Sequence, residues 1–220
     1  MEVDIAKVLG PVTRSVRYSE RDGKPASTVV LTRLYDTYVE DLWDALTSAE
    51  RIPRWFLPID GDLKLGGKYQ LKANAGGTIT ICTPPKHFAA TWEFGGGVSW
   101  IDVKLAPEGS HARLTLEHTA IIEGHWKQFG PGAVGIGWDL ALMGLDRNLA
   151  SGIPVDQRAA MVWMGSPNGK ELISQSGERW RVAHVASGED PTSAKQRSDC
   201  TIAFYRGEAL PDGTDPGADR

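Results

Sequence analysis

The feature that most constrains this chain is a run of short apolar segments between residues 59 and 120. Clusters of Gly, Pro and Asn interrupt the run about every 8–12 residues, which is the spacing of successive antiparallel strands. The interruptions fall at Gly66-Gly67, 74–77, Pro84-Pro85, 95–97 and 107–109. A sheet built from such a meander is apolar on one face, and another layer of the protein must cover that face.

The predicted strands share β-branched or alternating sequences. They lie at 26–35, 68–73, 77–83, 87–94, 98–106 and 111–120. In the last of them, Leu114, Leu116 and His118 fall on one face, whereas Arg113 and Glu117 fall on the other. We therefore expect Leu116 and His118 to point towards the covered side of the sheet.

Residues 132–151 are predicted to form the long helix that covers the sheet. Apolar residues recur there at steps of three or four, which places them on one helical face. This face consists of Val134, Trp138, Ala141, Leu142, Leu145 and Leu149. Gly135, Gly137 and Gly144 each cost about 1 kcal/mol relative to Ala inside a helix. We therefore expect a neighbouring backbone or a ligand to approach the helix closely at these glycines.

Two short helices are predicted at about 38–57, between the first strand and the meander. The second of them is short, apolar and not basic, which argues against a DNA-recognition helix. The preceding residues, 1–25, include an Asp22-Gly23 turn signal and predict either a short strand with a turn or a loosely held arm.

The sequence after residue 151 predicts further helices at 155–164, 167–186 and 191–206. Trp163, Trp180 and Phe204 supply apolar surface that a free extension would leave in water. We expect these helices to pack on the domain or on a second copy of the chain in a homodimer. The last residues, 207–220, are rich in Gly, Pro and Asp and are predicted to be disordered.

The composition argues against several kinds of partner. The net charge is −4 and no basic run exists, which disfavours nucleic acid. The best apolar stretch is interrupted by Asp139 and Asp146, so no helix is expected to span a membrane. The first residues lack the features of a signal peptide, and Cys82 and Cys200 are too few for a disulfide framework or a metal cluster. We expect a soluble, cytoplasmic protein without a metal or another cofactor.

Several short motifs, in this order and spacing, resemble a known superfamily. They are 39–47 (VEDLWDALT), Trp55-Phe56, Gly66-Gly67, Pro84-Pro85, Thr91-Trp92, 114–118 (LTLEH) and Gly137-Trp138. The chain resembles the START and birch-pollen-allergen-like superfamily, called SRPBCC. Its sequence is most similar to the branch of heat-shock-protein-90 ATPase activator homologues.

The resemblance covers about residues 26–151. It implies an α+β helix-grip (START-like) fold, in which a curved antiparallel sheet of six to seven strands grips the long helix. The expected organisation is an N-terminal arm (1–25), the helix-grip domain (26–151), a helical extension (152–206) and a tail (207–220).

The resemblance leaves three functions open. The first is binding of a hydrophobic or aromatic small molecule, lipid- or polyketide-like, in a cavity between the sheet and the long helix. The second is a protein-interaction module with a chaperone-like partner, similar to the heat-shock-protein-90 ATPase activators. The third is an enzyme similar to polyketide cyclases or dehydratases.

The predicted ligand-binding residues are aromatic or apolar, with one histidine among them. They are Trp43, Trp55, Phe56, Trp92, Leu116, His118, Trp138 and Met143. We expect Trp55 and Phe56 to guard the entrance of the cavity. The alternative for the tryptophans is ordinary core packing, because Trp serves both purposes.

No catalytic group is predicted. The sequence contains no Gly-x-Ser-x-Gly elbow and no Cys/His pair at a known spacing. Glu93, Glu117 and Asp139 are the carboxylates nearest the covered space, but alternation places Glu117 opposite His118, so an acid–base pair is poorly supported. His118 is either a buried residue that bonds to a neighbour or a polar group inside the cavity. No second histidine at a ligand spacing supports a metal site.

Overall fold

The computed structural model describes residues 2–211, which form an α+β fold of one sheet and eight helices. The strands are β1 (Thr13–Arg21), β2 (Lys24–Tyr35), β3 (Ile59–Gly61), β4 (Lys68–Leu71), β5 (Gly76–Thr83), β6 (His87–Phe94), β7 (Gly97–Glu108) and β8 (His111–Ile121). The helices are α1 (Ile5–Leu9), α2 (Val39–Thr47), α3 (Ile52–Trp55), α4 (His125–Phe129), α5 (Gly132–Ser151), α6 (Gln157–Met164), α7 (Pro167–Ala186) and α8 (Pro191–Arg206).

The sheet is antiparallel throughout, with the strand order β1-β2-β8-β7-β6-β5-β4-β3. The predicted helix-grip fold is confirmed, but the predicted number of strands was too low, because the sheet has eight. The two additional strands are the edges, β1 and β3. Only Val16 of β1 is buried and β3 has three residues, so neither carries the alternation that marks a half-buried strand.

The chain from Thr13 to Pro25 is therefore a hairpin at the edge of the sheet, and residues 5–9 form α1. The Asp22-Gly23 turn closes a hairpin in which all nine residues of β1 pair with β2. Of the two possibilities that the sequence left open, the strand with a turn is present and the loosely held arm is not.

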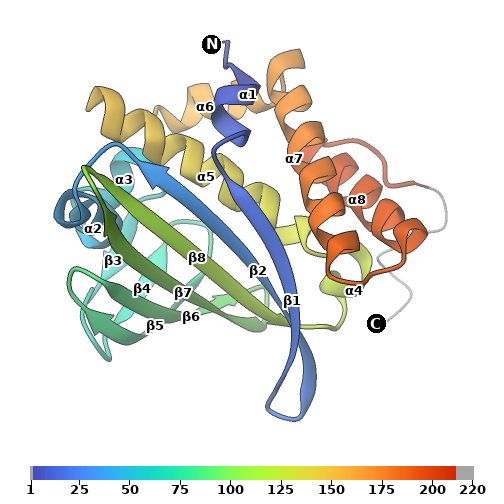
Figure 1. Cartoon of the computed structure of the whole chain (residues 1–220), viewed down its shortest axis with the longest axis horizontal. Helices are drawn as coiled ribbons and strands as arrows, with labels where there is room; N and C mark the ends of the chain where they lie inside the picture. Colours follow the sequence, from blue (N-terminus) through green and yellow to red (C-terminus); the bar gives the residue numbers. More distant parts are fainter. Residues whose placement is uncertain (1, 212–220) are drawn as a thin grey trace.

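Helix α5 lies across the inner face of the curved sheet (Figure 1). His118 pairs with Val29 and Ile101 in the register of β2, β8 and β7, and all three are buried. Glu117 points to the opposite face, where it forms an ion pair with Arg17 of β1. The alternation predicted for this strand is confirmed.

Gly135, Gly137 and Gly144 of α5 are positions where other parts of the protein approach the helix closely. A Cβ on Gly135 would collide with the Trp180 ring, and one on Gly137 would lie 2.9 Å from the Tyr205 hydroxyl. At Gly144 a Cβ would lie 2.5 Å from the backbone oxygen of Trp55. The glycines thus let α7, α8 and α3 contact α5 directly.

The segment between β8 and α5 is not an exposed loop. Residues 125–129 form α4, and its two large aromatic residues, Trp126 and Phe129, are buried. Trp126 belongs to the main hydrophobic core. This burial does not fit a mobile lid over the cavity.

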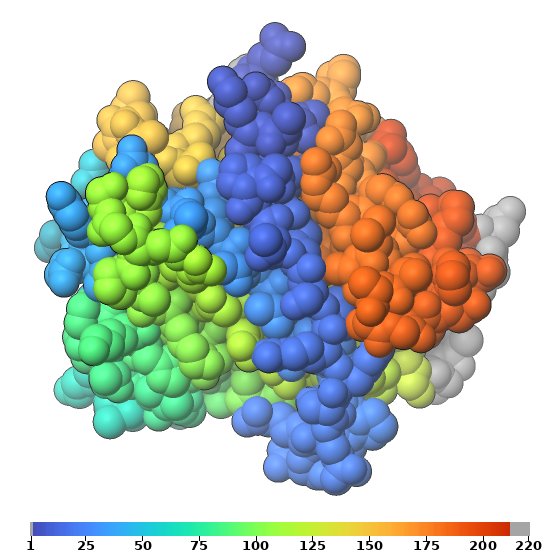
Figure 2. Space-filling view, in the orientation of Figure 1, coloured from blue at the N-terminus to red at the C-terminus, as the bar shows by residue number. Residues whose placement is uncertain are grey.

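The helices after residue 151 form close to the predicted bounds and pack on the domain. Helix α7 contacts both α5 and the edge strand β1, and α8 contacts α4, α5 and α7. Figure 2 shows α7 lying directly beside the N-terminal strand on this face of the molecule. Trp163 and Trp180 are buried, whereas Phe204 remains 56% exposed. Most of the predicted disordered tail, 212–220, lies outside the described residues.

Candidate functional site

A cavity of about 120 Å³ lies between the inner face of the sheet and α5, and α2 and α3 complete its wall. The wall is almost entirely hydrocarbon or aromatic. It consists of Leu46, Thr47, Ile52, Trp55, Phe56, Ile59, Leu63, Tyr69, Leu71, Ile79, Cys82, Phe88, Ala90, Trp92, Ile101, Val103, Leu114, Leu116, Trp138 and Leu142. The cavity is close in size to one of about 150 Å³ that holds benzene in another protein.

Four aromatic side chains meet on one side of the cavity. The rings of Trp55 and Phe56 stack with centroids 5.3 Å apart, and the rings of Phe56 and Trp138 stack with centroids 6.2 Å apart. Trp92 packs at an angle on Trp138 with centroids 5.3 Å apart. These residues come from α3, α5 and β6, so the aromatic wall exists only in the assembled fold.

A chain of hydrogen bonds behind the wall fixes the indole ring of Trp138. Its Nε1–H donates to Nδ1 of His118 at 3.0 Å, and His118 Nε2 lies 2.8 Å from the Ser99 hydroxyl. Ser99 in turn donates to the backbone oxygen of Trp92 at 3.1 Å. Because Nδ1 accepts the indole proton, the imidazole proton lies on Nε2 and donates to Ser99. The arrangement requires a neutral His118.

Burial favours the same neutral form. His118 is 2% exposed, and its desolvation lowers its pKa to about 4. A protonated imidazole would point a second N–H at the indole N–H of Trp138, which has no acceptor to offer. The histidine therefore positions Trp138 and does not act as a proton carrier near neutral pH.

This difference in pKa predicts a pH dependence of stability. A histidine in the unfolded chain titrates near pH 6.5, whereas folded His118 stays neutral down to about pH 4. The stability that it contributes is fully present above about pH 6.5 and is lost as the pH falls to about 4, up to roughly 3 kcal/mol. We expect His118→Gln to reduce this loss, measured by urea denaturation between about pH 7 and about pH 4. Identical pH dependence in the variant and the parent protein would contradict the assignment.

Three polar groups of the cavity wall have partners in the protein. The Tyr69 hydroxyl donates to the oxygen of Thr91 at 2.7 Å, and burial raises its pKa. Trp55 Nε1–H donates to the Ala45 oxygen at 2.8 Å, and the Thr47 hydroxyl donates to a helix carbonyl. A ligand in this cavity therefore meets apolar surface and few polar groups that could bond to it.

Helix α3, which carries the Trp55-Phe56 side of the wall, is held by the chain after α5. The backbone N–H of Val155 donates to the oxygen of Arg54 at 2.8 Å, and Arg54 Nη2 donates to the oxygen of Gly152 at 2.8 Å. The side chain of Gln157 donates to the oxygen of Phe56. The start of the helical extension thus ties down one wall of the cavity.

Five of the eight predicted ligand-binding residues line the cavity, namely Trp55, Phe56, Trp92, Leu116 and Trp138. Two others lie behind the wall. Trp43 packs edge-on against Phe88, which itself lines the cavity, and His118 holds Trp138 from behind.

Met143 lies on another side of α5. It is buried with Val8, Leu9, Trp163 and Leu172, in a cluster outside the main core. One residue along a helix corresponds to a turn of about 100°, so Met143 points away from the cavity that its neighbour Leu142 lines.

Several lining residues were not predicted, among them Tyr69, Ala90 and Leu142. Leu142 lies on the predicted apolar face of the long helix, and Ala90 lies on the inner face of an alternating strand. These patterns place residues on a covered face, but a pattern does not show which part of that face surrounds an open volume. Tyr69 carries no separate signal in its short strand.

The described residues include no helix that combines the length and the hydropathy needed to cross a membrane. Within residues 2–211, no three His, Cys, Asp or Glu side chains are grouped closely enough to hold a metal ion. Both Cys82 and Cys200 are free thiols.

Comparison with known proteins finds similar structures. The chain is similar to CalU16 from Micromonospora echinospora, whose crystal structure shares 28% identity with it, over 78% of this chain and 97% of CalU16, at a TM-score of 0.65. The solution structure of CalU16 gives 27% identity, 80% and 96% coverage, and a TM-score of 0.68. PFC0360w, an HSP90 activator from Plasmodium falciparum, shares 27% identity over 43% of this chain and 73% of its own, at a TM-score of 0.40. No curated protein matches the chain.

The family comparison matches residues 36–150 to the family described as activator of Hsp90 ATPase homolog 1-like protein. The matched range begins after β2 and ends with α5, so it includes every strand and helix that contributes to the cavity wall. It covers more than half of the chain. The chain therefore belongs to the family of activator of Hsp90 ATPase homolog 1-like proteins.

Proposed function

We propose that this protein binds an apolar, aromatic small molecule in the cavity between the sheet and α5. The observation that carries the proposal is the cavity of about 120 Å³ whose wall is apolar and whose aromatic residues stack on one side. If α5 served only to cover the sheet, larger side chains that filled this volume would make the protein more stable. An empty cavity lowers the free energy of unfolding.

The chemistry of the wall supports a particular class of ligand. Stacked indole and phenyl rings favour a planar aromatic molecule, which gains from offset or edge contacts. A charged group inside the cavity would lose its hydration without a partner, since the lining contains no Asp, Glu, Lys, Arg or His among the described residues. The ligand is thus an aromatic molecule that places one ring in the cavity, with a second ring or any polar group directed out of it.

Thermal-shift measurements with a small series of ligands test the proposal. We expect naphthalene at about ten times its dissociation constant to raise the free energy of unfolding by about 1.4 kcal/mol. Cyclohexane should stabilise the protein less because it cannot stack, and 2-naphthoate should stabilise it least because of its carboxylate. If none of the three compounds shifts the unfolding temperature, the cavity does not bind this class of ligand.

A protein-interaction function is the second candidate, and the family match favours it because the family takes its description from activators of the Hsp90 ATPase. Its test is to add the purified protein to a heat-shock-protein-90 chaperone and to measure the rate of ATP hydrolysis. Stimulation that persists when the cavity is filled by mutation would favour this candidate over ligand binding.

A cyclase- or dehydratase-like reaction has less support. Such an enzyme needs a group that moves a proton next to its substrate. The lining residues include no carboxylate or imidazole, and His118 behind the wall is held in its neutral form by Trp138. Ligand binding without an acid–base step is therefore the function that this cavity supports best.

A further inference from the structure

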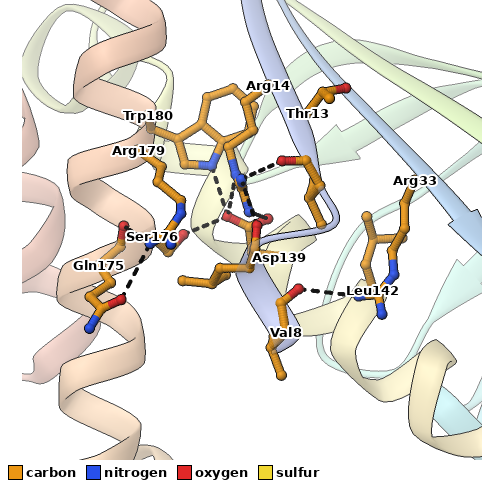
Figure 3. A network of polar contacts seen from close by, with 12 residues as sticks. Val8, Thr13, Arg14, Arg33, Asp139, Leu142, Gln175, Ser176, Arg179 and Trp180 are labelled. Carbon is orange, nitrogen blue, oxygen red and sulfur yellow. Dashed lines mark hydrogen bonds and ion pairs between the residues drawn. The ribbon is translucent and has the colours of Figure 1, made fainter. Parts of the chain in front are cut away.

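The carboxylate of Asp139 on α5 is enclosed by the protein and accepts four hydrogen bonds. Its side chain is 0% exposed, and it accepts hydrogen bonds from Arg14, Ser176 and Trp180. Arg14 donates twice, from Nη2 at 2.7 Å and from Nε at 3.1 Å, while the Ser176 hydroxyl lies at 2.6 Å and Trp180 Nε1 at 3.1 Å. A carboxylate has about four acceptor positions, and Asp139 accepts four hydrogen bonds, three at Oδ2 and one at Oδ1. Figure 3 shows the three side chains pointing at Asp139.

The donors come from two elements outside the cavity. Arg14 belongs to β1, and Ser176 and Trp180 belong to α7. Arg14 is itself fixed, because its Nη1 donates to the backbone oxygens of Leu9 at 3.2 Å and Val12 at 2.8 Å. The network therefore joins α5 to the N-terminal strand and to the helical extension in one geometry.

Trp138, the residue before Asp139 on α5, attaches the helix to the sheet on its other side. Its indole bonds to His118 and forms part of the cavity wall. Asp139 and Trp138 share a rigid helical backbone, so a rotation of α5 about its axis would move both side chains together. Apolar contacts alone permit small rotations, whereas a buried carboxylate with four directional bonds permits one orientation.

The packing of Trp180 reinforces this orientation. Its ring occupies the space that a side chain at Gly135 would need, one turn before Asp139. Trp180 thus contacts α5 through its ring and through its indole N–H at the same time.

We propose that Asp139 is a positioning residue for the binding cavity: through Arg14, Ser176 and Trp180 it fixes the rotation of α5 and thereby the position of Trp138. The proposal rests on the proposed function, since it assigns to Asp139 a part of the affinity for aromatic ligands. It also gives the helical extension a role in binding, although α7 contributes no residue to the cavity wall.

The test compares Asp139→Asn with Asp146→Asn in the full chain. Asp146 lies on the same helix and pairs with the buried Arg33 of β2 at 2.7 Å, so its loss also removes an ion pair of α5. We expect Asp139→Asn to weaken naphthalene binding about tenfold or more in calorimetry, because Trp138 is no longer pre-positioned. The Trp138 indole N–H resonance, assigned with Trp138→Phe, should shift or broaden. Asp146→Asn should leave both the affinity and this resonance unchanged.

Ser176→Ala provides a milder variant if Asp139→Asn does not fold, since it removes one of the four hydrogen bonds. It should shift the Trp138 resonance in the same direction and weaken binding by a smaller factor. An unchanged Trp138 resonance and unchanged affinity in the folded variant would overturn the proposal. If the parent protein binds no naphthalene, the proposed function fails, and the resonance alone then decides whether Asp139 positions Trp138.

Discussion

Ala90→Phe is expected to abolish the binding of aromatic ligands while the fold remains intact. Ala90 lies on β6 and lines the cavity. A phenyl ring is about the size of benzene, which binds in a cavity of about 150 Å³ in another protein, so the new side chain would fill the cavity of about 120 Å³ found here. We expect the affinity for naphthalene to fall about 100-fold or more, which corresponds to about 2.7 kcal/mol. Titration calorimetry measures the change.

Ala89→Phe is the matched control. Ala89 precedes Ala90 on β6 and pairs with Asp102, so its side chain points to the outer face of the sheet. The control should bind naphthalene as the parent protein does. The unfolding temperature of Ala90→Phe should stay level or rise, because filling a cavity commonly stabilises a protein by about 0.5–2 kcal/mol. Undiminished binding by a folded Ala90→Phe variant would show that the ligand binds elsewhere.

Arg14→Met is expected to cause the largest loss of stability among single changes at charged residues. The side chains of Arg14 and Asp139 are 5% and 0% exposed, so removing the guanidinium leaves a buried carboxylate with only Ser176 and Trp180 as donors. Breaking one side of a buried ion pair typically costs about 3–5 kcal/mol. Chemical denaturation of the variant at neutral pH measures this loss.

Arg17→Met tests whether burial is the cause. Arg17 lies on the same strand and pairs with Glu117 at 2.6 Å, but the two side chains are 57% and 22% exposed. Exposed pairs contribute about 0–1 kcal/mol because water screens them. Equal losses for the two variants would mean that the Asp139 network contributes no more than a surface pair.

The sequence determined the architecture because its periodic patterns report which residues are covered. The alternation in residues 111–120 placed Leu116 and His118 inside, and the spacing in 132–151 placed Trp138 on the side of α5 that faces the sheet. These predictions need only the geometry of one strand or one helix. The edge strand β1 remained one of two possibilities because most of its side chains are exposed, so burial left little pattern in its sequence.

The tertiary structure decided what covers each face. Met143 and Leu142 are both apolar and adjacent, yet only Leu142 lines the cavity, because α5 is enclosed on several sides by different elements. The close approach expected at the glycines of α5 is present, but the approaching groups belong to α3, α7 and α8. Asp139 lies off the predicted apolar face of the helix, where a carboxylate is normally solvated. It is buried because Arg14 and Ser176, which lie 125 and 37 positions away in the chain, donate hydrogen bonds to it. Contacts across such separations depend on how the helices and strands pack, and local periodicity contains no information about that packing.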